Sequence, residues 1–198
     1  MRTSRLEAFS DGVLAIIITI MVLELHVPSG DDWQALGDSA TGFLTYALSF
    51  VYVGIYWNNH HHMFQVVEQI TGGVLWANLH LLFWLSLFPF STAWMDESGF
   101  QRTPVIVYGL NLLCAAIAYF VVQRMIFRGP GGHRLRDALG NDLKGKASPA
   151  MYLAGIALSF LQPWLAVAAF VLAALVWLVP DRRVERYLRD EPARSGTR

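Results

Sequence analysis

The sequence predicts an all-α protein that crosses a membrane several times. Hydrophobic residues make up 55% of the chain and charged residues only 15%, well below the quarter that is usual in soluble domains. A chain of this composition has too few polar side chains to cover a soluble surface. Its apolar residues gather in six stretches, at about 6–25, 41–66, 73–94, 104–127, 149–161 and 164–179. We therefore expect one six-helix transmembrane domain over residues 1–198, with a short basic tail at 180–198.

The lengths of the stretches refine this prediction. About 20 helical residues span the hydrocarbon core of a bilayer, and each of the first four stretches reaches that length. The last two are shorter and are joined only by Gln162-Pro163, which suits a tight helical hairpin. Ser148-Pro149 is a favourable helix start, because a cap residue precedes a proline. The charged segment 128–147 is expected to be a loop or a short surface helix.

The distribution of Lys and Arg predicts the orientation of the chain. Fourteen of the 15 lie near the N-terminus, in or beside the connection between the fourth and fifth stretches, or in the tail. With six crossings these three regions share one side, and only Arg102 lies on the other. The positive-inside rule then places both termini in the cytoplasm. The basic tail is interpreted as an anchor or a contact with anionic lipids rather than a nucleic-acid site.

The opposite side of the membrane is expected to be acidic. Glu24 lies at the end of the first stretch, Asp31 and Asp32 follow it, and further acids flank the later stretches on that side. An acidic outer mouth would concentrate cations near the protein. Acidic outer loops are also common in membrane proteins, so this pattern alone leaves both interpretations open.

The stretch from Arg5 to Pro28 divides into two faces when residues are placed 100° apart. One stripe contains Phe9, Val13, Ile16, Ile20, Leu23 and Val27, with Gly12 and Thr19 at its edge. Asp11 lies nearly opposite and needs polar partners, because a carboxylate facing lipid is costly. The uncharged stripe is free to face lipid, a neighbouring subunit or a pore. Periodicity alone also describes ordinary helix packing, and Ser10-Asp11 also fits a simple interfacial helix cap.

The remaining polar residues argue against an enzyme or a metal protein. His60-His61-His62 resembles a metal cluster, but adjacent helical residues point about 100° apart, so the three cannot bind one ion. A hydrogen-bonded anchor for Asp11 suits these histidines better. Asn78 and Asn111 lie within apolar stretches and are expected to form interhelical hydrogen bonds. The sequence contains one cysteine and no P-loop, catalytic triad or paired catalytic carboxylates.

Three motifs, found in the first three helices, resemble those of a known family. The first helix contains Arg5-x-x-x-Phe9-Ser10-Asp11, followed by Gly12-Val13, Ala15-Ile16 and Thr19. The second contains Trp57-x-x-His60-His61-x-x-Phe64, and the third ends in Leu87-Phe88-Pro89-Phe90, followed by Thr92-Ala93. In order and position they resemble the transmembrane protein 175 family, the lysosomal-type potassium channels and their prokaryotic relatives. The resemblance covers the whole chain in length, helix count and topology.

The resemblance implies a homotetramer in which the first helix lines a central pore. It implies a constriction at Ile16, further apolar layers at Ile20 and Leu23, and a role for Thr19 in cation preference. It also implies that the first-helix cluster contacts the second helix; the residues of this polar anchor are Arg5, Phe9, Ser10, Asp11, Trp57, His60 and His61. Of the two histidines, either is a possible partner of Asp11.

The function implied is that of a potassium-permeable cation channel in the plasma membrane of a prokaryote. Its selectivity is expected to be weak to moderate, because the sequence has no Thr-Val-Gly-Tyr-Gly filter and its only Tyr-Gly, Tyr108-Gly109, lies within a helix. Potassium is the permeant ion, and no cofactor is expected. Two alternatives remain: a proton-coupled transporter that uses Asp11 and the second-helix histidines, and a non-conducting membrane scaffold or lipid sensor.

Overall fold

The structure, a computed structural model, describes residues 3–65, 67, 69–130, 132, 136 and 143–178. Every regular element in these described residues is a helix, so the all-α prediction is confirmed. The helices are α1 (Thr3–Leu23), α2 (Trp33–Asp38), α3 (Ala40–Gln65), α4 (Gly72–Ser86), α5 (Phe88–Glu97), α6 (Arg102–Arg128), α8 (Leu143–Leu158) and α9 (Pro163–Leu178). The predicted basic tail, 180–198, lies outside the described residues.

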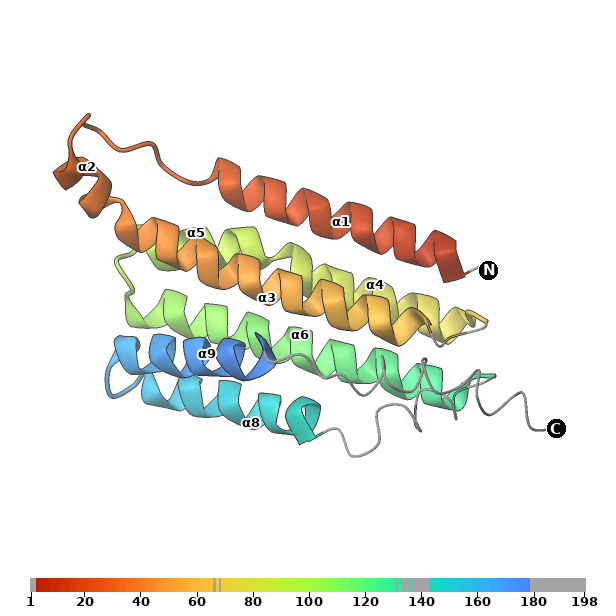
Figure 1. The fold of residues 1–198 in the computed structure, drawn as a ribbon. Coiled ribbons are helices and arrows are strands. Elements are labelled where there is room, and N and C mark those ends of the chain that lie inside the picture. Colours follow the sequence, from red (N-terminus) through yellow and green to blue (C-terminus); the bar gives the residue numbers. More distant parts are fainter. Residues whose placement is uncertain are drawn as a thin grey trace.

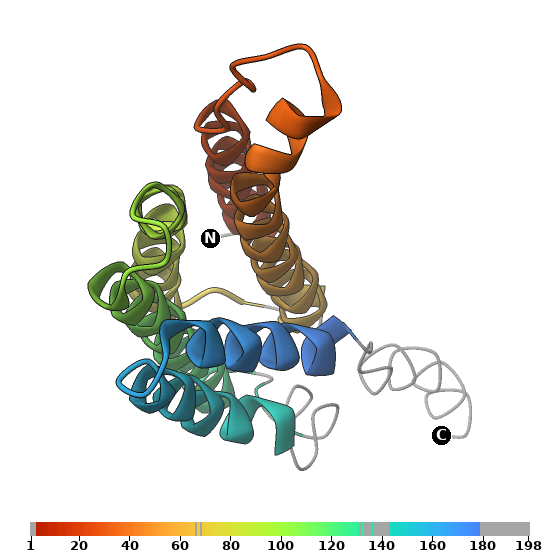
Figure 2. The same cartoon turned by 90° about the vertical axis from the view of Figure 1, so that its left-hand side faces the viewer.

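The helices form a bundle with α1 at one side and the α8–α9 hairpin at the other (Figures 1 and 2). Helix α1 packs against α3, α4 and α5, whereas α6 packs against α4, α5, α8 and α9. Figure 1 also shows that α1 begins and α6 ends at the same end of the bundle. Helix α1 is therefore a peripheral element of the single chain.

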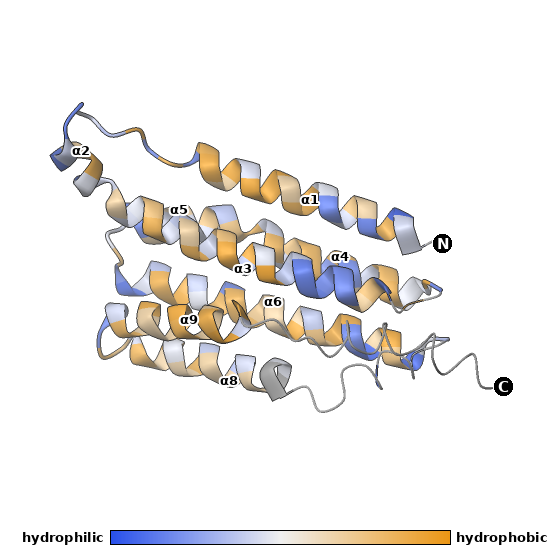
Figure 3. Ribbon diagram, in the orientation of Figure 1, coloured by the Kyte–Doolittle hydropathy of each residue, from blue (hydrophilic) through white to orange (hydrophobic). Residues whose placement is uncertain are grey.

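Four helical segments of the described chain are long and apolar enough to cross a membrane. They are 3–23, 40–65, 72–97 and 102–128, and two shorter apolar helices cover 147–158 and 163–178. Hydrophobic residues colour most of the bundle, while hydrophilic residues gather toward the N-terminal end of α1 and the C-terminal end of α3 (Figure 3). The polar residues of these two helices are thus close together in space.

The third apolar stretch differs from the expected continuous helix. It forms two helices, α4 and α5, with Leu87 between them and Pro89 in the first turn of α5. Proline has no N–H to donate, and its ring clashes with the carbonyl of the residue four positions earlier. The interruption at Leu87 follows directly from this chemistry.

Three smaller differences concern the end of one helix, the start of another and one additional short helix. Helix α1 ends at Leu23, so Val27 of the predicted stripe lies beyond the helix. Helix α8 begins at Leu143, before Ser148-Pro149, and includes Pro149 within it. The short helix α2 was not expected; Asp32 caps it by accepting a hydrogen bond from the Ala35 N–H at 2.8 Å.

The aromatic centre of the core lies away from α1, although Leu6, Leu14, Ile17 and Met21 of α1 join the same buried cluster. Aromatic rings from α3, α5, α6 and α9 pack together there, with ring contacts between Tyr52 and Phe88, Phe88 and Tyr108, and Tyr108 and Phe170. The Tyr52 hydroxyl donates to the Phe170 carbonyl at 2.6 Å, which joins α3 to α9. Helix α1 is therefore attached to a bundle whose centre is built by other helices.

Candidate functional site

Helix α1 contacts the bundle through one narrow face. Its buried residues recur every three or four positions, as one side of a helix does; they are Leu6, Ser10, Leu14, Ile17 and Met21. This face lies between the two faces that the sequence distinguished. Asp11 lies to one side of it and the apolar stripe to the other, so α1 presents three faces rather than two.

The apolar stripe of α1 is exposed along the helix. The exposed fraction is 60% for Ile16, 41% for Ile20 and 76% for Leu23, and Phe9 is also exposed. Thr19 lies on the same side, and its hydroxyl donates to the Ala15 carbonyl at 2.8 Å. Large apolar side chains thus line a surface that the described part of the chain leaves uncovered.

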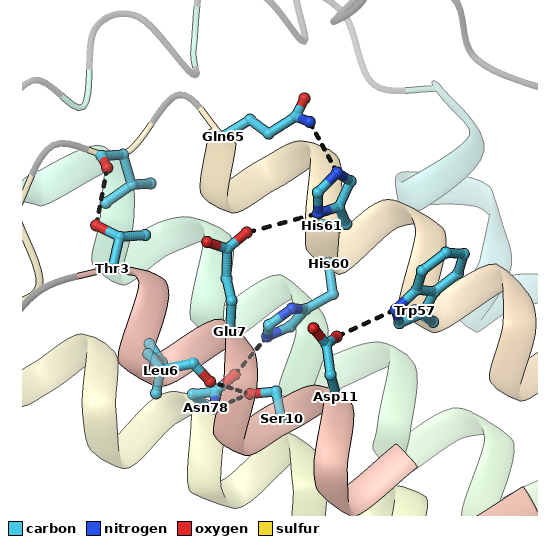
Figure 4. A network of polar contacts seen from close by, with 11 residues as sticks. Thr3, Leu6, Glu7, Ser10, Asp11, Trp57, His60, His61, Gln65 and Asn78 are labelled. Atoms are coloured by element: carbon cyan, nitrogen blue, oxygen red, sulfur yellow. Dashed lines mark hydrogen bonds and ion pairs between the residues drawn. The ribbon is translucent and has the colours of Figure 1, made fainter. Parts of the chain in front are cut away.

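A buried hydrogen-bond chain joins α1, α4 and α3 (Figure 4). The Asn78 amide Nδ2 donates to Ser10 Oγ at 3.0 Å, and the Asn78 Oδ1 lies 2.7 Å from His60 Nε2, which must be the donor. All three side chains are buried. Removing any one of them would leave a buried polar atom without its partner, which costs about 1–3 kcal/mol.

A second set of contacts lies beside this chain and is more exposed. Trp57 Nε1 donates to Asp11 Oδ1 at 3.1 Å, and His61 Nδ1 lies 3.6 Å from Glu7 Oε1 (Figure 4). His61 also forms a hydrogen bond with Gln65 at 2.8 Å. These contacts hold α1 to α3 along the edge of the buried face.

The structure brings together most of the predicted anchor; Asp11 pairs with Trp57 as expected, but the histidines have other partners. Within the described residues, neither His60 nor His61 forms a hydrogen bond with Asp11, which is instead bonded to Trp57. Trp57 and His61 lie four positions apart on one face of α3, and they meet Asp11 and Glu7, which are four positions apart on α1. His60 points instead toward Asn78 of α4. Arg5 is exposed, and it forms no hydrogen bond or ion pair with the described part of the chain.

Two members of the anchor were missed in the sequence. Glu7 lies four positions before Asp11 and so shares its side of α1, a spacing that would have indicated a common set of partners. Asn78 was expected to form an interhelical hydrogen bond, which it does. Nothing in the sequence indicated that it would join Ser10 to His60, because all three lie on different helices.

The acids predicted for the outer mouth have different environments. Glu24, Asp31 and Asp32 are all exposed, and Asp32 serves as the cap of α2. Glu24 lines a cleft of about 680 Å³ between the end of α1 and α5, together with Ile20, Trp94 and Glu97. In the part of the chain that the structure describes, no group of three or more His, Cys, Asp or Glu side chains could hold a metal ion.

The anchor and the stripe both lie within a region that matches a known family. A sequence model of the family described as "Endosomal/lysosomal potassium channel TMEM175" matches residues 5–89. A potassium channel of Chryseobacterium sp. (strain P1-3) is 52% identical over 191 residues, which cover 96% of this chain and 100% of that protein. The human endosomal/lysosomal proton channel TMEM175 is 35% identical over 112 residues, covering 50% of this chain and 22% of that protein.

A solved structure is similar to the whole bundle. It is a lysosomal potassium-selective channel TMEM175 homolog from Chamaesiphon minutus, with a TM-score of 0.74 and 31% identity. The match covers 89% of this chain and 96% of that chain. The relatives are membrane ion channels rather than enzymes, and the family predicted from the three motifs is confirmed. This chain is a membrane protein that belongs to the TMEM175 family.

Proposed function

We propose that this chain is the subunit of a potassium-permeable cation channel in which four copies surround a pore lined by α1. The observation that carries the proposal is the exposed apolar stripe of Ile16, Ile20 and Leu23 on a helix attached by one face. Similar proteins from Chryseobacterium sp. and Chamaesiphon minutus are named potassium channels, which supports potassium as the permeant ion.

The stripe suits a gate better than a binding site for ions. In a cyclic assembly the same surface of every copy meets at the axis, so Ile16 would form a ring, with rings of Ile20 and Leu23 beyond it. Such a ring blocks ions by dewetting when it is narrow and conducts when the helices move apart. Thr19 adds one hydroxyl to this apolar lining, which supports a role in cation preference.

Asp11 is proposed to be a structural residue rather than an ion ligand. Its carboxylate accepts a hydrogen bond from Trp57, and it lies on a different face from Ile16. Together with Ser10, His60 and Asn78 it would hold one end of α1 while the stripe faces the pore. Weak to moderate potassium selectivity follows, because the pore would offer side chains instead of a ring of backbone carbonyls.

We place the channel in the plasma membrane of a prokaryote, with six crossings and both termini in the cytoplasm. The positive-inside rule supports this orientation. Arg5 near the start of α1 and Arg124 and Arg128 near the end of α6 belong to the same end of the bundle (Figure 1). The hairpin of α8 and α9 would supply the fifth and sixth crossings.

The test is ion flux through purified protein in liposomes. Wild-type protein should pass potassium, and Ile16→Asn should raise the flux about tenfold or more, because an amide hydrates an apolar constriction. Val22→Asn is the matched control: Val22 is an exposed apolar residue of α1 that lies off the stripe. Absence of cation flux from well-folded tetramers of both wild type and Ile16→Asn would refute the channel.

A second candidate function is proton transport, favoured by the name of the mammalian relatives, endosomal/lysosomal proton channel. Proton-coupled transport through Asp11 and the histidines predicts saturable, pH-coupled flux that Asp11→Asn abolishes without loss of assembly. If flux persists in Asp11→Asn, the carrier is excluded. If flux falls because the tetramer is lost, the anchor role of Asp11 is supported.

A further inference from the structure

The motif that ends the third apolar stretch has no role in the function proposed above. It comprises Leu87-Phe88-Pro89-Phe90 and the following Thr92-Ala93, and it forms the break after α4 and the first turns of α5. Helix α5 packs against α1, α3 and α6. Because the helix is interrupted at Leu87, the position of α5 depends on these contacts as well as on its connection to α4.

Helix α5 has two different faces. Phe88, Ser91, Thr92 and Met95 are buried at helical spacing in the bundle. The opposite side, with Phe90, Ala93, Trp94 and Glu97, lines the cleft of about 680 Å³ whose other wall contains Ile20 and Glu24 of α1. Helix α5 therefore stands between the core of the bundle and the C-terminal half of α1.

The buried face of α5 is attached to both neighbouring helices by hydroxyl groups. Thr92 Oγ1 lies 2.7 Å from Ser49 Oγ of α3, and Ser49 Oγ lies 3.0 Å from the Tyr108 hydroxyl of α6. We call Ser49, Thr92 and Tyr108 the hydroxyl cluster. One position earlier, Ser91 Oγ accepts a hydrogen bond from Asn111 Nδ2 of α6 at 3.2 Å.

We propose that Thr92 is a positioning residue for the gate, which it controls through α5 rather than by touching ions. This inference rests on the proposed channel function. The hydroxyl cluster holds α5 in one rotation and at one depth, since a buried hydroxyl that loses its partner is costly. Helix α5 in turn limits how far the C-terminal half of α1, which carries Ile20 and Leu23, can move.

The cleft beside Ile20 explains why the position of α5 matters for the movement of α1. Its volume leaves space between Ile20 and the exposed face of α5, so the C-terminal half of α1 is only partly supported there. A displacement of α5 changes that space directly. The N-terminal half of α1 is held separately through Ser10 and Asn78, so loss of the hydroxyl cluster should alter the gate without releasing α1.

The experiment compares two buried threonines in the liposome flux assay. Thr92→Val keeps the shape of the side chain and removes the hydroxyl, and it should raise potassium flux about fivefold at equal protein density. Thr45→Val is the control, because Thr45 is also a buried threonine but its hydroxyl, among the described residues, bonds only to the Thr41 carbonyl of its own helix, at 2.8 Å. Thr92→Ser restores the hydroxyl and should bring the flux back to within twofold of wild type.

If wild type conducts and Thr92→Val behaves like Thr45→Val, the positioning role is wrong while the channel stands. A reduced flux in Thr92→Val would also overturn it. If wild type fails to conduct, the failure lies with the proposed function. A distance measurement then tests whether the hydroxyl cluster fixes α5 relative to α1. Spin labels are placed on Glu24→Cys and Ala93→Cys in a Cys114→Ala background, since Cys114 is the single cysteine. The distribution should broaden with Thr92→Val and not with Thr45→Val; an unchanged distribution refutes the proposal.

Discussion

The two halves of α1 are attached to the bundle by different kinds of contact. The N-terminal half is held by directional hydrogen bonds, from Asn78 to Ser10 and from Trp57 to Asp11. The C-terminal half buries only apolar side chains, Leu14, Ile17 and Met21, and borders an open cleft. Directional bonds to buried groups specify one geometry, whereas apolar contacts tolerate sliding. The difference indicates a helix with one fixed half and one adjustable half.

The largest effect on stability should come from the centre of the N-terminal contacts. Asn78→Leu leaves Ser10 and His60 without their shared partner, and we expect a loss of roughly 2 kcal/mol in the free energy of unfolding. Reversible unfolding in detergent would measure it. Asn111→Leu is the control, because Asn111 joins α6 to α5 and not to α1. If Asn78→Leu does not lower the protection of α1 from hydrogen exchange, the fixed half is held by something else.

A smaller effect is expected at the exposed edge of the same half. Trp57→Phe keeps an aromatic ring and removes the donor to Asp11, and about 0.5–1 kcal/mol of stability should be lost, because Trp57 is half exposed. Asp11→Asn keeps an oxygen that can accept from Trp57 and should lose less than Trp57→Phe. The same unfolding measurement ranks the two variants. The reverse order would mean that the negative charge of Asp11, rather than the hydrogen bond, holds the helix.

The smallest effect on stability should appear in the C-terminal half. Leu23→Ala removes a side chain that is 76% exposed, so the isolated subunit should lose less than about 0.5 kcal/mol. In the proposed tetramer the same change widens the last apolar ring and should raise potassium flux. Measuring tetramer dissociation in parallel separates the effect of Leu23→Ala on the subunit from its effect on the assembled pore. If Leu23→Ala lowered subunit stability as much as Asn78→Leu, the two halves of α1 would not differ in how firmly they are attached.

Some parts of the site were predictable because they depend on local sequence. The stripe of Ile16, Ile20 and Leu23 follows from the period of the helix, and the three side chains are exposed on one side of α1 in the structure. The contact of Trp57 with Asp11 was expected from the motifs, and the structure contains it. The partners of the histidines were not predictable, since only the packing of the helices brings His61 to Glu7 and His60 to Asn78.

The all-α class, the membrane location and the family follow from the sequence alone, because composition, periodicity and motif order are properties of the chain itself. The tertiary structure alone decided that Asn78 would join Ser10, 68 residues away, to His60, and that Thr92 would meet Ser49 and Tyr108. A buried polar side chain has several possible partners in sequence, and only the packing of the helices brings one of them within hydrogen-bond distance. For α1, the sequence distinguished its two outward faces, and packing placed the buried face between them.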